Sequence, residues 1–299
     1  MGRLLALFGC LVAVVLPVRG GAAQEPFRGG VELVAVGATV FDSNGRLVTN
    51  LSVDDFDLRE DGVPQTVQVF ARGAGEGAVP LHLGLLFDRS GSLEREFALE
   101  RAAAVKFLEQ VPDVEDVTLV EFNTDVRVTK YAAAHLGRVG DRIRELTPGG
   151  WTAFYDALAV YLDGERRPSG RTILIMYTDG EDTRSQASLS GLLDQLRGSS
   201  ITVFAVGLMN QVGPARERLQ ARIRQMAELT GGRAFFPSSV EELDAAYAQL
   251  LTELKAQYFL GYAPSASKPA GTWRRLDVRV KQPGLRVRAR PGYLARKTR

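Results

Sequence analysis

The sequence predicts an α/β fold with a doubly wound, mostly parallel sheet, flanked by β segments at both ends of the chain. Between residues 80 and 257, short apolar runs alternate with stretches of helical spacing, which is the order typical of such a sheet. Several of these runs are apolar throughout, as strands buried on both faces are. Residues 24–79 and 258–299 instead alternate apolar and polar side chains between glycine, proline and asparagine turns, which indicates β structure.

The first 23 residues have the order of a secretory signal peptide: Arg3, an apolar run over residues 4–18, and small residues ending at Ala23. A membrane-spanning helix needs about 20 apolar residues, and Arg19 ends this run too early. We therefore expect cleavage near Ala23 and no transmembrane segment in the mature chain. The protein is then exported, to the periplasm, the cell envelope or the medium.

Composition narrows the class of protein. Of the 299 residues, 45% are hydrophobic and 24% are charged, as in an ordinary folded protein with a sizeable core. The single cysteine, Cys10, lies in the predicted signal peptide, so the mature chain is expected to have no disulfide. Without Arg3 and Arg19, 35 basic residues balance 35 acidic ones, and this neutral balance gives no reason to expect nucleic acid as a partner.

The N-terminal β segment, residues 24–79, contains two strand patterns at 31–41 and 63–71. An acidic connector with an Asp-Gly turn lies between them at 51–62, and a glycine-rich linker follows at 72–79. The C-terminal β segment contains three further strand patterns, at residues 258–264, 273–282 and 285–294.

The domain at 80–257 is expected to alternate strands with helices. Its predicted strands cover residues 81–87, 117–122, 126–131, 171–178, 201–208 and 233–236. Its predicted helices cover residues 93–111, 135–146, 154–162, 188–198, 215–231 and 238–256.

The two β segments differ in charge. Residues 24–80 carry four Arg against nine Asp or Glu, whereas residues 273–299 carry ten Lys or Arg against one Asp. Each segment has roughly 40 residues, which is marginal for a separate core without disulfides. We predict that they pair into one discontinuous β domain, with the α/β domain inserted between them and its site facing away. The basic strands VRVKQ and VRARP should lie beside the acidic connector.

Three polar clusters are expected at one edge of the predicted sheet. In a doubly wound sheet, ligands bind beyond the carboxyl ends of the strands. One cluster, DRSGS, follows the strand at 81–87, another, PGGWT, precedes the helix at 154–162, and the third, TDGED, ends the strand at 171–178. Their candidate ligands are two carboxylates and three hydroxyls: Asp88, Ser90, Ser92, Thr152 and Asp179.

This donor set predicts a metal site. Oxygen-only ligands suit hard divalent cations, Mg²⁺ foremost, with Mn²⁺ and Ca²⁺ as alternatives. Two aspartates balance a 2+ ion formally, but hydroxyls donate weakly, and contacts through water would leave the ion electrophilic. Such an ion attracts an outside carboxylate, so the expected partner is a protein that presents an Asp or Glu side chain.

The same residues resemble the metal-ion-dependent adhesion site of von Willebrand factor type A domains. D-x-S-x-S at Asp88, G-G-x-T at Thr152 and T-D-G at Asp179 match that pattern in order, and the resemblance covers roughly residues 80–256. It implies that Ser90 and Ser92 contact the metal directly and that Thr152 contacts it in the ligand-bound form. It implies that the two aspartates contact the metal directly or through water. The flanks resemble exported bacterial proteins related to that family.

Each residue also has a plainer interpretation. Ser90 and Ser92 could cap the following helix, and alone they would favour that reading. Asp182 and Thr183 are expected to cap the helix that follows them rather than bind metal. Trp151 is either an exposed recognition residue or a packed loop residue.

An enzyme is not indicated. A hydrolase nucleophile elbow needs G-x-S-x-G, and FDRSGS lacks the first glycine. An aspartyl-phosphate enzyme usually has a second carboxylate where this chain has Ser90, and no Walker A or dinucleotide pattern occurs. We expect a non-catalytic binding module for adhesion or assembly. A structural envelope or complex-assembly subunit with a purely stabilising metal is the alternative, and a metal-dependent hydrolase comes after it.

Overall fold

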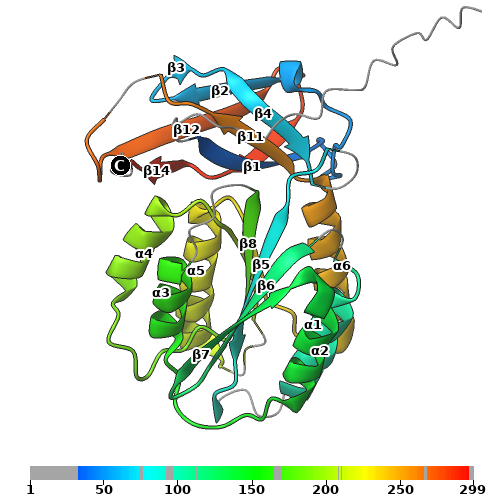
Figure 1. The fold of residues 1–299 in the computed structure, drawn as a ribbon, viewed down its shortest axis with the longest axis vertical. Coiled ribbons are helices and arrows are strands. Elements are labelled where there is room, and N and C mark those ends of the chain that lie inside the picture. The colour runs from blue at the N-terminus through cyan, green and yellow to red at the C-terminus, as the bar shows by residue number, and fades with distance from the viewer. Residues whose placement is uncertain are drawn as a thin grey trace, which may run out of the picture. The chain divides into compact units, whose positions relative to one another are not determined.

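A six-stranded sheet lies at the centre of the α/β part, in the order β10-β9-β8-β5-β6-β7 (Figure 1). Its strands are β5 (Leu81–Asp88), β6 (Val114–Phe122), β7 (Val126–Ala132), β8 (Arg171–Tyr177), β9 (Thr202–Val206) and β10 (Arg233–Phe235). Neighbours run parallel except β6 and β7, which pair antiparallel. Every residue of β5 is buried, because helices cover both faces of the sheet. The predicted mostly parallel sheet is confirmed.

The structure is a computed structural model of the chain. It describes residues 33–73, 77–91, 97–111, 114–164, 170–207, 209, 211–265 and 268–295. The predicted signal peptide, Ser92 and the start of the helix expected at 93–111 lie outside these residues. No helix among the described residues has both the length and the apolar character that a membrane span requires.

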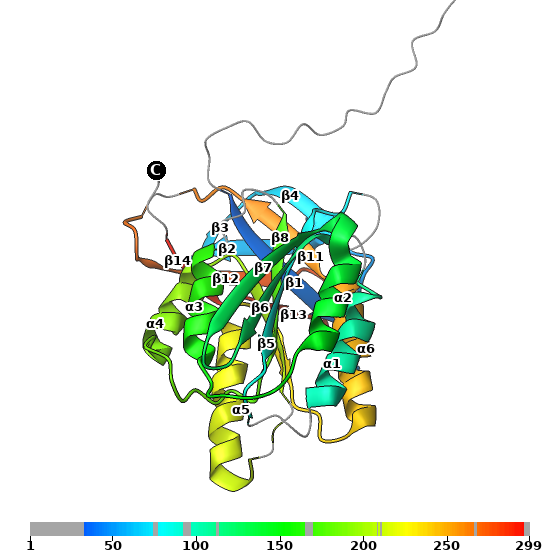
Figure 2. The same cartoon turned by 60° about the horizontal axis from the view of Figure 1, so that its bottom comes forward.

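Among the described residues, six helices pack against the sheet, three on each face, and Figures 1 and 2 show them on both sides of it. One face packs against α1 (Phe97–Leu108), α2 (Leu136–Glu145) and α6 (Val240–Ala256), and the other against α3 (Phe154–Gly164), α4 (Leu189–Gly198) and α5 (Gly213–Leu229). Each face has its own apolar core, in which helix side chains meet the side chains of the strands. Two short 3₁₀ turns, Val53–Asp55 and Ala133–His135, complete the described helical structure.

The N- and C-terminal segments build two antiparallel sheets together. One has the order β13-β1-β11-β4 and the other β14-β12-β2-β3. The strands are β1 (Val34–Phe41), β2 (Phe56–Glu60), β3 (Val63–Pro64), β4 (Val67–Arg72), β11 (Tyr258–Tyr262), β12 (Trp273–Val280), β13 (Arg286–Ala289) and β14 (Gly292–Leu294). The apolar side chains of both sheets form a third core. Because β1 pairs with β11 and β13, and β12 pairs with β2, the two segments do pair as predicted.

Two details of that prediction are wrong. The acidic connector is not a loop throughout, because residues 56–60 form β2, with alternate side chains buried. Only one basic strand, β12, lies beside it, with Leu276 opposite Glu60, whereas β13 pairs with β1. Pairing follows the apolar face of each strand, which must point into the core, and charge matching adds little to that preference.

A buried charged cluster joins the two segments and was not foreseen. Glu60 is 4% exposed, and its carboxylate pairs with the guanidinium of Arg274, which is also 4% exposed. The hydroxyls of Tyr262 and Tyr293 donate to the same carboxylate at 2.5 and 2.7 Å. We expected the charge match at an exposed surface, but this ion pair lies inside the third core.

Candidate metal site

Four of the five predicted ligands lie on three loops at the carboxyl edge of the central sheet. Asp88 is the last residue of β5, Thr152 lies two residues before α3, and Asp179 lies two residues after β8. Asp88, Ser90 and Asp179 are fully buried, and Thr152 is 3% exposed. Linker residue 79 enters the opposite end of β5, so the site is at the end of this strand remote from the linker.

Backbone hydrogen bonds hold these loops against one another. Gly149 N donates to Arg89 O at 2.8 Å and Gly91 N donates to Gly150 O at 3.2 Å, which joins the loop after β5 to the loop before α3. Thr152 O accepts from the backbone of the loop after β8, at 2.9 Å from residue 183 and 3.1 Å from residue 184. The fold therefore brings the three predicted clusters together.

Neutral donors surround the Asp88 carboxylate. Its Oδ1 accepts from Ser90 N at 2.9 Å, and its Oδ2 accepts from the hydroxyl of Thr178 at 2.8 Å. The Thr178 hydroxyl in turn accepts from Gly180 N at 3.1 Å, so Thr178 connects the ends of β5 and β8. The Ser90 side chain also bonds to Asp88.

The Asp179 carboxylate is held by the turn that follows it and by a side chain from the next crossover. Its Oδ1 accepts from Glu181 N at 2.9 Å, and its Oδ2 accepts from the amide of Gln211 at 3.1 Å. The same amide donates to the Glu181 carboxylate at 2.7 Å. Gln211 therefore holds Asp179 from the residues just before α5.

The electrostatics of the site favour a cation. Burial, and after it the neighbouring charge of Asp179, raise the pKa of Asp88 to about 7, although hydrogen bonds from Ser90 and Thr178 act in the opposite direction. Within the described residues, neither aspartate forms an ion pair with Lys or Arg. Two adjacent buried carboxylates without a cation are costly, and a divalent ion would offset both charges.

The donor set also fits a hard cation in kind. No group of three or more His, Cys, Asp or Glu side chains that could hold a metal gathers among the described residues. The candidate site has a different composition, with two carboxylates and several hydroxyls, all of them oxygen donors, as Mg²⁺ and Ca²⁺ prefer. A structural zinc site would instead be built from histidine and cysteine side chains.

The loop before α3 needs its two glycines and exposes a tryptophan. Gly149 and Gly150 have φ angles of 150° and 87°, in the region where only glycine is unstrained. A Cβ on Gly150 would also approach the Thr124 hydroxyl to 2.7 Å. Trp151 next to them is 65% exposed, so of the two interpretations the packed one is wrong.

Several residues that support the site were missed from the sequence. Asp182 and Thr183 were expected to cap the helix after them, but Ser188 caps α4, while Asp182 bonds to the first turn of α3 and Thr183 to the loop just before it. Thr183 accepts from Thr152 N at 3.0 Å, and Asp182 accepts from Tyr155 N at 3.2 Å. Thr178 could have been found, because it is the first residue of the T-D-G pattern. No local pattern indicates Gln211.

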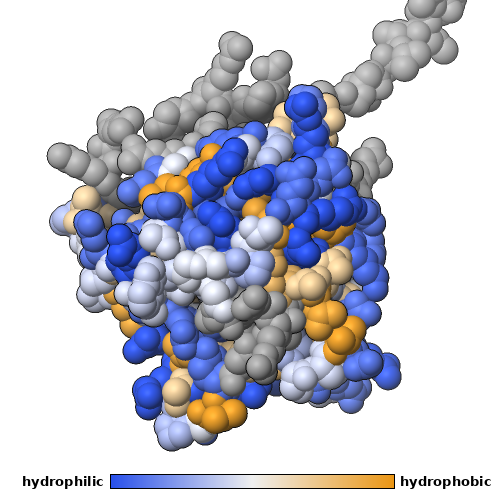
Figure 3. All heavy atoms as spheres, turned by 90° about the horizontal axis from the view of Figure 1, so that it is seen from below, coloured by the Kyte–Doolittle hydropathy of each residue, from blue (hydrophilic) through white to orange (hydrophobic). Residues whose placement is uncertain are grey.

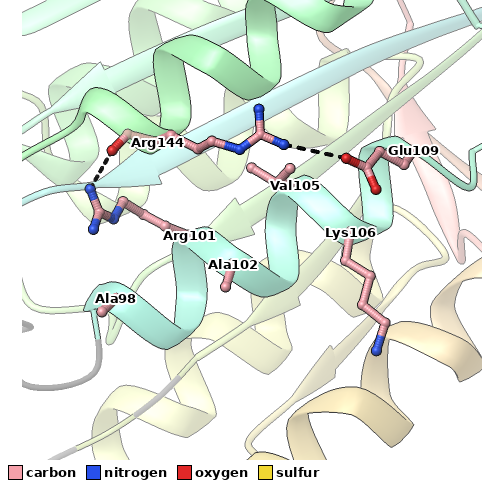
Figure 4. A pocket seen from close by; sticks show the side chains of 7 residues that line it. All are labelled: Ala98, Arg101, Ala102, Val105, Lys106, Glu109 and Arg144. Carbon is pink, nitrogen blue, oxygen red and sulfur yellow. Dashed lines mark hydrogen bonds and ion pairs between the residues drawn. The ribbon is translucent and has the colours of Figure 1, made fainter.

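A separate surface pocket lies between α1 and α2, with a volume of roughly 350 Å³. Figure 4 shows two contacts across it: Arg144 donates to the Glu109 carboxylate, and Arg101 donates to the backbone carbonyl of Arg144 at 2.6 Å. Its lining has three cationic side chains and one carboxylate. It is therefore unsuited to a metal cation, and the strand-end edge is the better candidate site.

A comparison with known protein families identifies the α/β part of the chain. Residues 82–249 match the family model of the von Willebrand factor type A domain. Among curated proteins, none matches the chain.

Solved structures share the fold at low sequence identity. A von Willebrand factor type A protein from Catenulispora acidiphila has 12% identity and a TM-score of 0.51, and the match covers 87% of this chain and 73% of that one. The pilus adhesin SpaC from Lactobacillus rhamnosus GG, in an open conformation, has 10% identity and a TM-score of 0.50, covering 81% and 48%. Proximal thread matrix protein 1 from the mussel byssus, with a zinc-occupied MIDAS motif, has 20% identity and a TM-score of 0.49, covering 67% and 50%. The chain thus spans about half to three quarters of these structures.

Proposed function

The chain belongs to the von Willebrand factor type A domain family, and we propose that it is an exported, non-catalytic module that binds a partner protein through a divalent cation. The cation would be held at Asp88, Ser90, Thr152 and Asp179, with Ser92 as the further ligand that the sequence motif predicts. Mg²⁺ is the first choice, with Mn²⁺ and Ca²⁺ as alternatives. When bound, the ion would supply an electrophilic position for a carboxylate oxygen of the partner.

One observation carries this proposal: Asp88 and Asp179 are buried next to each other without a cation among the described residues. Three other buried carboxylates, those of Glu60, Glu121 and Glu253, are paired with arginine. Glu121 is bonded by Arg142 at 2.6 and 2.7 Å, and Glu253 is paired with Arg233 and Arg288. A fold that supplies arginines for these carboxylates but only neutral donors for Asp88 and Asp179 leaves room for an ion from outside.

The chain's own residues would have two different roles at the site. The neutral donors Thr178 and Gln211 fix the orientation of the two carboxylates without discharging them. Ser90 and Thr152 would add neutral oxygens, which leave the ion able to attract an anion. The burial of all four ligands limits the approach of water and strengthens the electrostatic attraction.

An acid–base role for these serines lacks support. The chain has two histidines, and His82 lies at the other end of β5, six residues before Asp88 and so about 20 Å away. Its Nδ1 bonds to Asp116 at 3.0 Å. His135 lies in the 3₁₀ turn at the far end of β7 from the loop at residues 123–125. A binding module is the reading that these positions favour.

Thermal unfolding tests the metal site. Ion binding to the folded state stabilises it by RT ln(1 + [L]/Kd), which is about 2.7 kcal/mol at 100 times Kd. Mg²⁺ or Mn²⁺ should therefore raise the melting temperature of the wild type relative to EDTA, and Asp179→Ala should lose this response. Asp163→Ala, which changes an exposed aspartate of α3, is the matched control and should keep it. Equal responses in Asp179→Ala and the control would exclude the site.

Affinity capture from the cell envelope tests the binding role. Wild type and Asp88→Ala are compared, each with Mg²⁺ and with EDTA. A specific partner should be retained only by the wild type in Mg²⁺, and Thr152→Ala should lose it while keeping its fold. A partner retained equally in EDTA would indicate the alternative, a structural subunit whose metal only stabilises the loops.

A further inference from the structure

The first turns of α5 carry arginines beside the candidate site. The helix begins at Gly213, two residues after Gln211, whose amide is bonded to Asp179. Arg218 and Arg222 follow within the first ten residues of the helix, and both are exposed. In Figure 2 the start of α5 stands out at the lower edge of the cartoon, beyond the neighbouring helices.

Arg218 and Arg222 lie on one side of α5, and Arg222 contacts α3. Residues four apart in a helix share a face, so Arg218 and Arg222 lie one above the other. The Arg222 side chain bonds to the hydroxyl of Tyr155, in the first turn of α3. Thr152 lies just before that turn. Arg218 is one turn nearer to the start of α5, and the adjacent residue, Leu219, lies close to Gly180 in the loop after β8.

A third arginine reaches the same edge from the loop after β8. Arg184 N donates to Thr152 O at 3.1 Å, and its side chain is exposed. We call Arg184, Arg218 and Arg222 the basic flank. Figure 3 shows the molecule from below, the side toward which β5 runs in Figure 1, and its visible surface is largely hydrophilic with separate apolar spots.

Apart from the bond between Arg222 and Tyr155, local folding preferences do not explain the basic flank. Like charges four residues apart on a helix repel each other, and cations near a helix N-terminus oppose its dipole. The first turn of α5 has no acidic residue to compensate. In the described part of the chain, Arg184 and Arg218 form no ion pair, whereas Arg197 of α4 pairs with Asp194 at 2.7 Å. Residues that break local preferences without a compensating contact are candidates for function.

We propose that the basic flank binds acidic side chains that adjoin the partner's metal-bound carboxylate, so that the partner is an acidic polypeptide segment. This inference rests on the proposed function, since it places the partner's first carboxylate on the cation. Arginine suits the task because its planar guanidinium binds carboxylates through two parallel hydrogen bonds. The cation and the flank would then attract the same segment from one side, which favours acidic partners over basic ones.

Short fluorescent peptides test the proposal. Each has a central Asp, flanked by Glu, by Ser or by Lys, and binding is measured by fluorescence anisotropy in Mg²⁺ and in EDTA. In Mg²⁺ at low salt, the Glu-flanked peptide should bind the wild type about tenfold more tightly than the Ser-flanked one, and the Lys-flanked peptide most weakly. Added salt should reduce this difference in affinity between the peptides.

Two double variants distinguish the effect of the basic flank on binding from the effect of the protein's overall charge. R218Q/R222Q should reduce the preference for the Glu-flanked peptide to about twofold, while leaving Mg²⁺-dependent binding of the Ser-flanked peptide in place. R46Q/R286Q removes the same charge from two exposed positions of the β part and should keep the full preference. Melting temperatures verify that both variants are folded.

The outcomes distinguish the two proposals. If Mg²⁺-dependent binding occurs with equal affinity for the three peptides, or R218Q/R222Q keeps the full preference, the flank proposal is wrong and the proposed function stands. If the Glu preference survives in EDTA and depends on Arg218 and Arg222, the arginines bind acidic segments without the cation, so the metal role is wrong and only the acidic chemistry of the partner stands. If no peptide binds at about 1 mM, both are wrong.

Discussion

Glu60 in the β part and Asp88 in the α/β part are both buried carboxylates, but they are neutralised differently. Glu60 has a buried guanidinium, that of Arg274, and two tyrosine hydroxyls, so its charge is balanced within the chain. Asp88 has the hydroxyls of Ser90 and Thr178 and a second carboxylate, Asp179, beside it. The first cluster joins two segments of the chain, whereas the second has no balancing cation among the described residues. A buried acidic side chain therefore indicates a functional site only when the groups that contact it leave its charge unbalanced.

The largest expected effect is on the balanced cluster. Arg274→Ala would leave Glu60 buried without its cation, and removing one partner of a buried ion pair costs about 3–5 kcal/mol. We expect the free energy of unfolding in urea to fall by that amount. Arg275→Ala, at the exposed position next in the strand, should change it by less than about 0.5 kcal/mol. If the two variants are equally stable, the Glu60 cluster does not hold the β part together.

Removing charge from the second cluster should have the opposite sign. Asp88→Asn keeps the size of the side chain but removes one of two adjacent buried charges, so in EDTA at pH 8 it should stabilise the protein by about 1–3 kcal/mol. The stabilising effect of Mg²⁺ should be lost in the same variant. The measurement is urea unfolding with Asp163→Asn as the control. A destabilised variant in EDTA would mean that Asp88 is compensated within the chain.

A smaller effect is expected for the hydroxyl that supports Asp88. Thr178→Val removes the donor to Asp88 Oδ2 and the acceptor of Gly180 N, which should cost about 1–2 kcal/mol in EDTA. Thr39 of β1 is a matched control: it is fully buried, and its hydroxyl has no partner within the described structure. Thr39→Val should be neutral or slightly stabilising. Similar losses in both variants would show that shape, and not hydrogen bonding, decides the result.

The smallest effect on stability is expected for Trp151→Ala. The side chain is 65% exposed, so its loss should change the free energy of unfolding by less than about 0.5 kcal/mol and leave the Mg²⁺ response intact. Binding of a captured partner should weaken, because an exposed aromatic beside the site offers contact area. Trp273 provides the contrast: it packs against Gly292 in the β part, so Trp273→Ala should cost more stability. Undiminished partner binding by Trp151→Ala would remove this residue from the interface.

The sequence by itself determined the local elements and the identity of the candidate ligands. Apolar runs such as residues 81–87 predict buried strands because a strand covered on both faces must be apolar throughout, and β5 is such a strand. The order of Asp88, Thr152 and Asp179 along the chain, each next to a predicted strand end or helix start, was enough to place all three at one edge. The pairing of the two β segments could also be predicted, since neither has enough residues for its own core.

Only the tertiary structure decided which groups meet across long stretches of chain. Glu60 and Arg274 are 214 residues apart, and Asp179 and Gln211 are 32 apart, so no local pattern links them. The register of β12 on β2 is set by which side chains must enter the core. This register buries the Glu60–Arg274 ion pair, whereas the charges of the two segments alone led us to expect the charge match at the surface. Similarly, Asp182 bonds to α3 and Thr183 to the loop before it, rather than to the helix that follows them. The polar groups of a loop form hydrogen bonds with whichever groups the folded chain brings close to them. The sequence indicates the local preference of each residue, but not which distant residues will lie beside it.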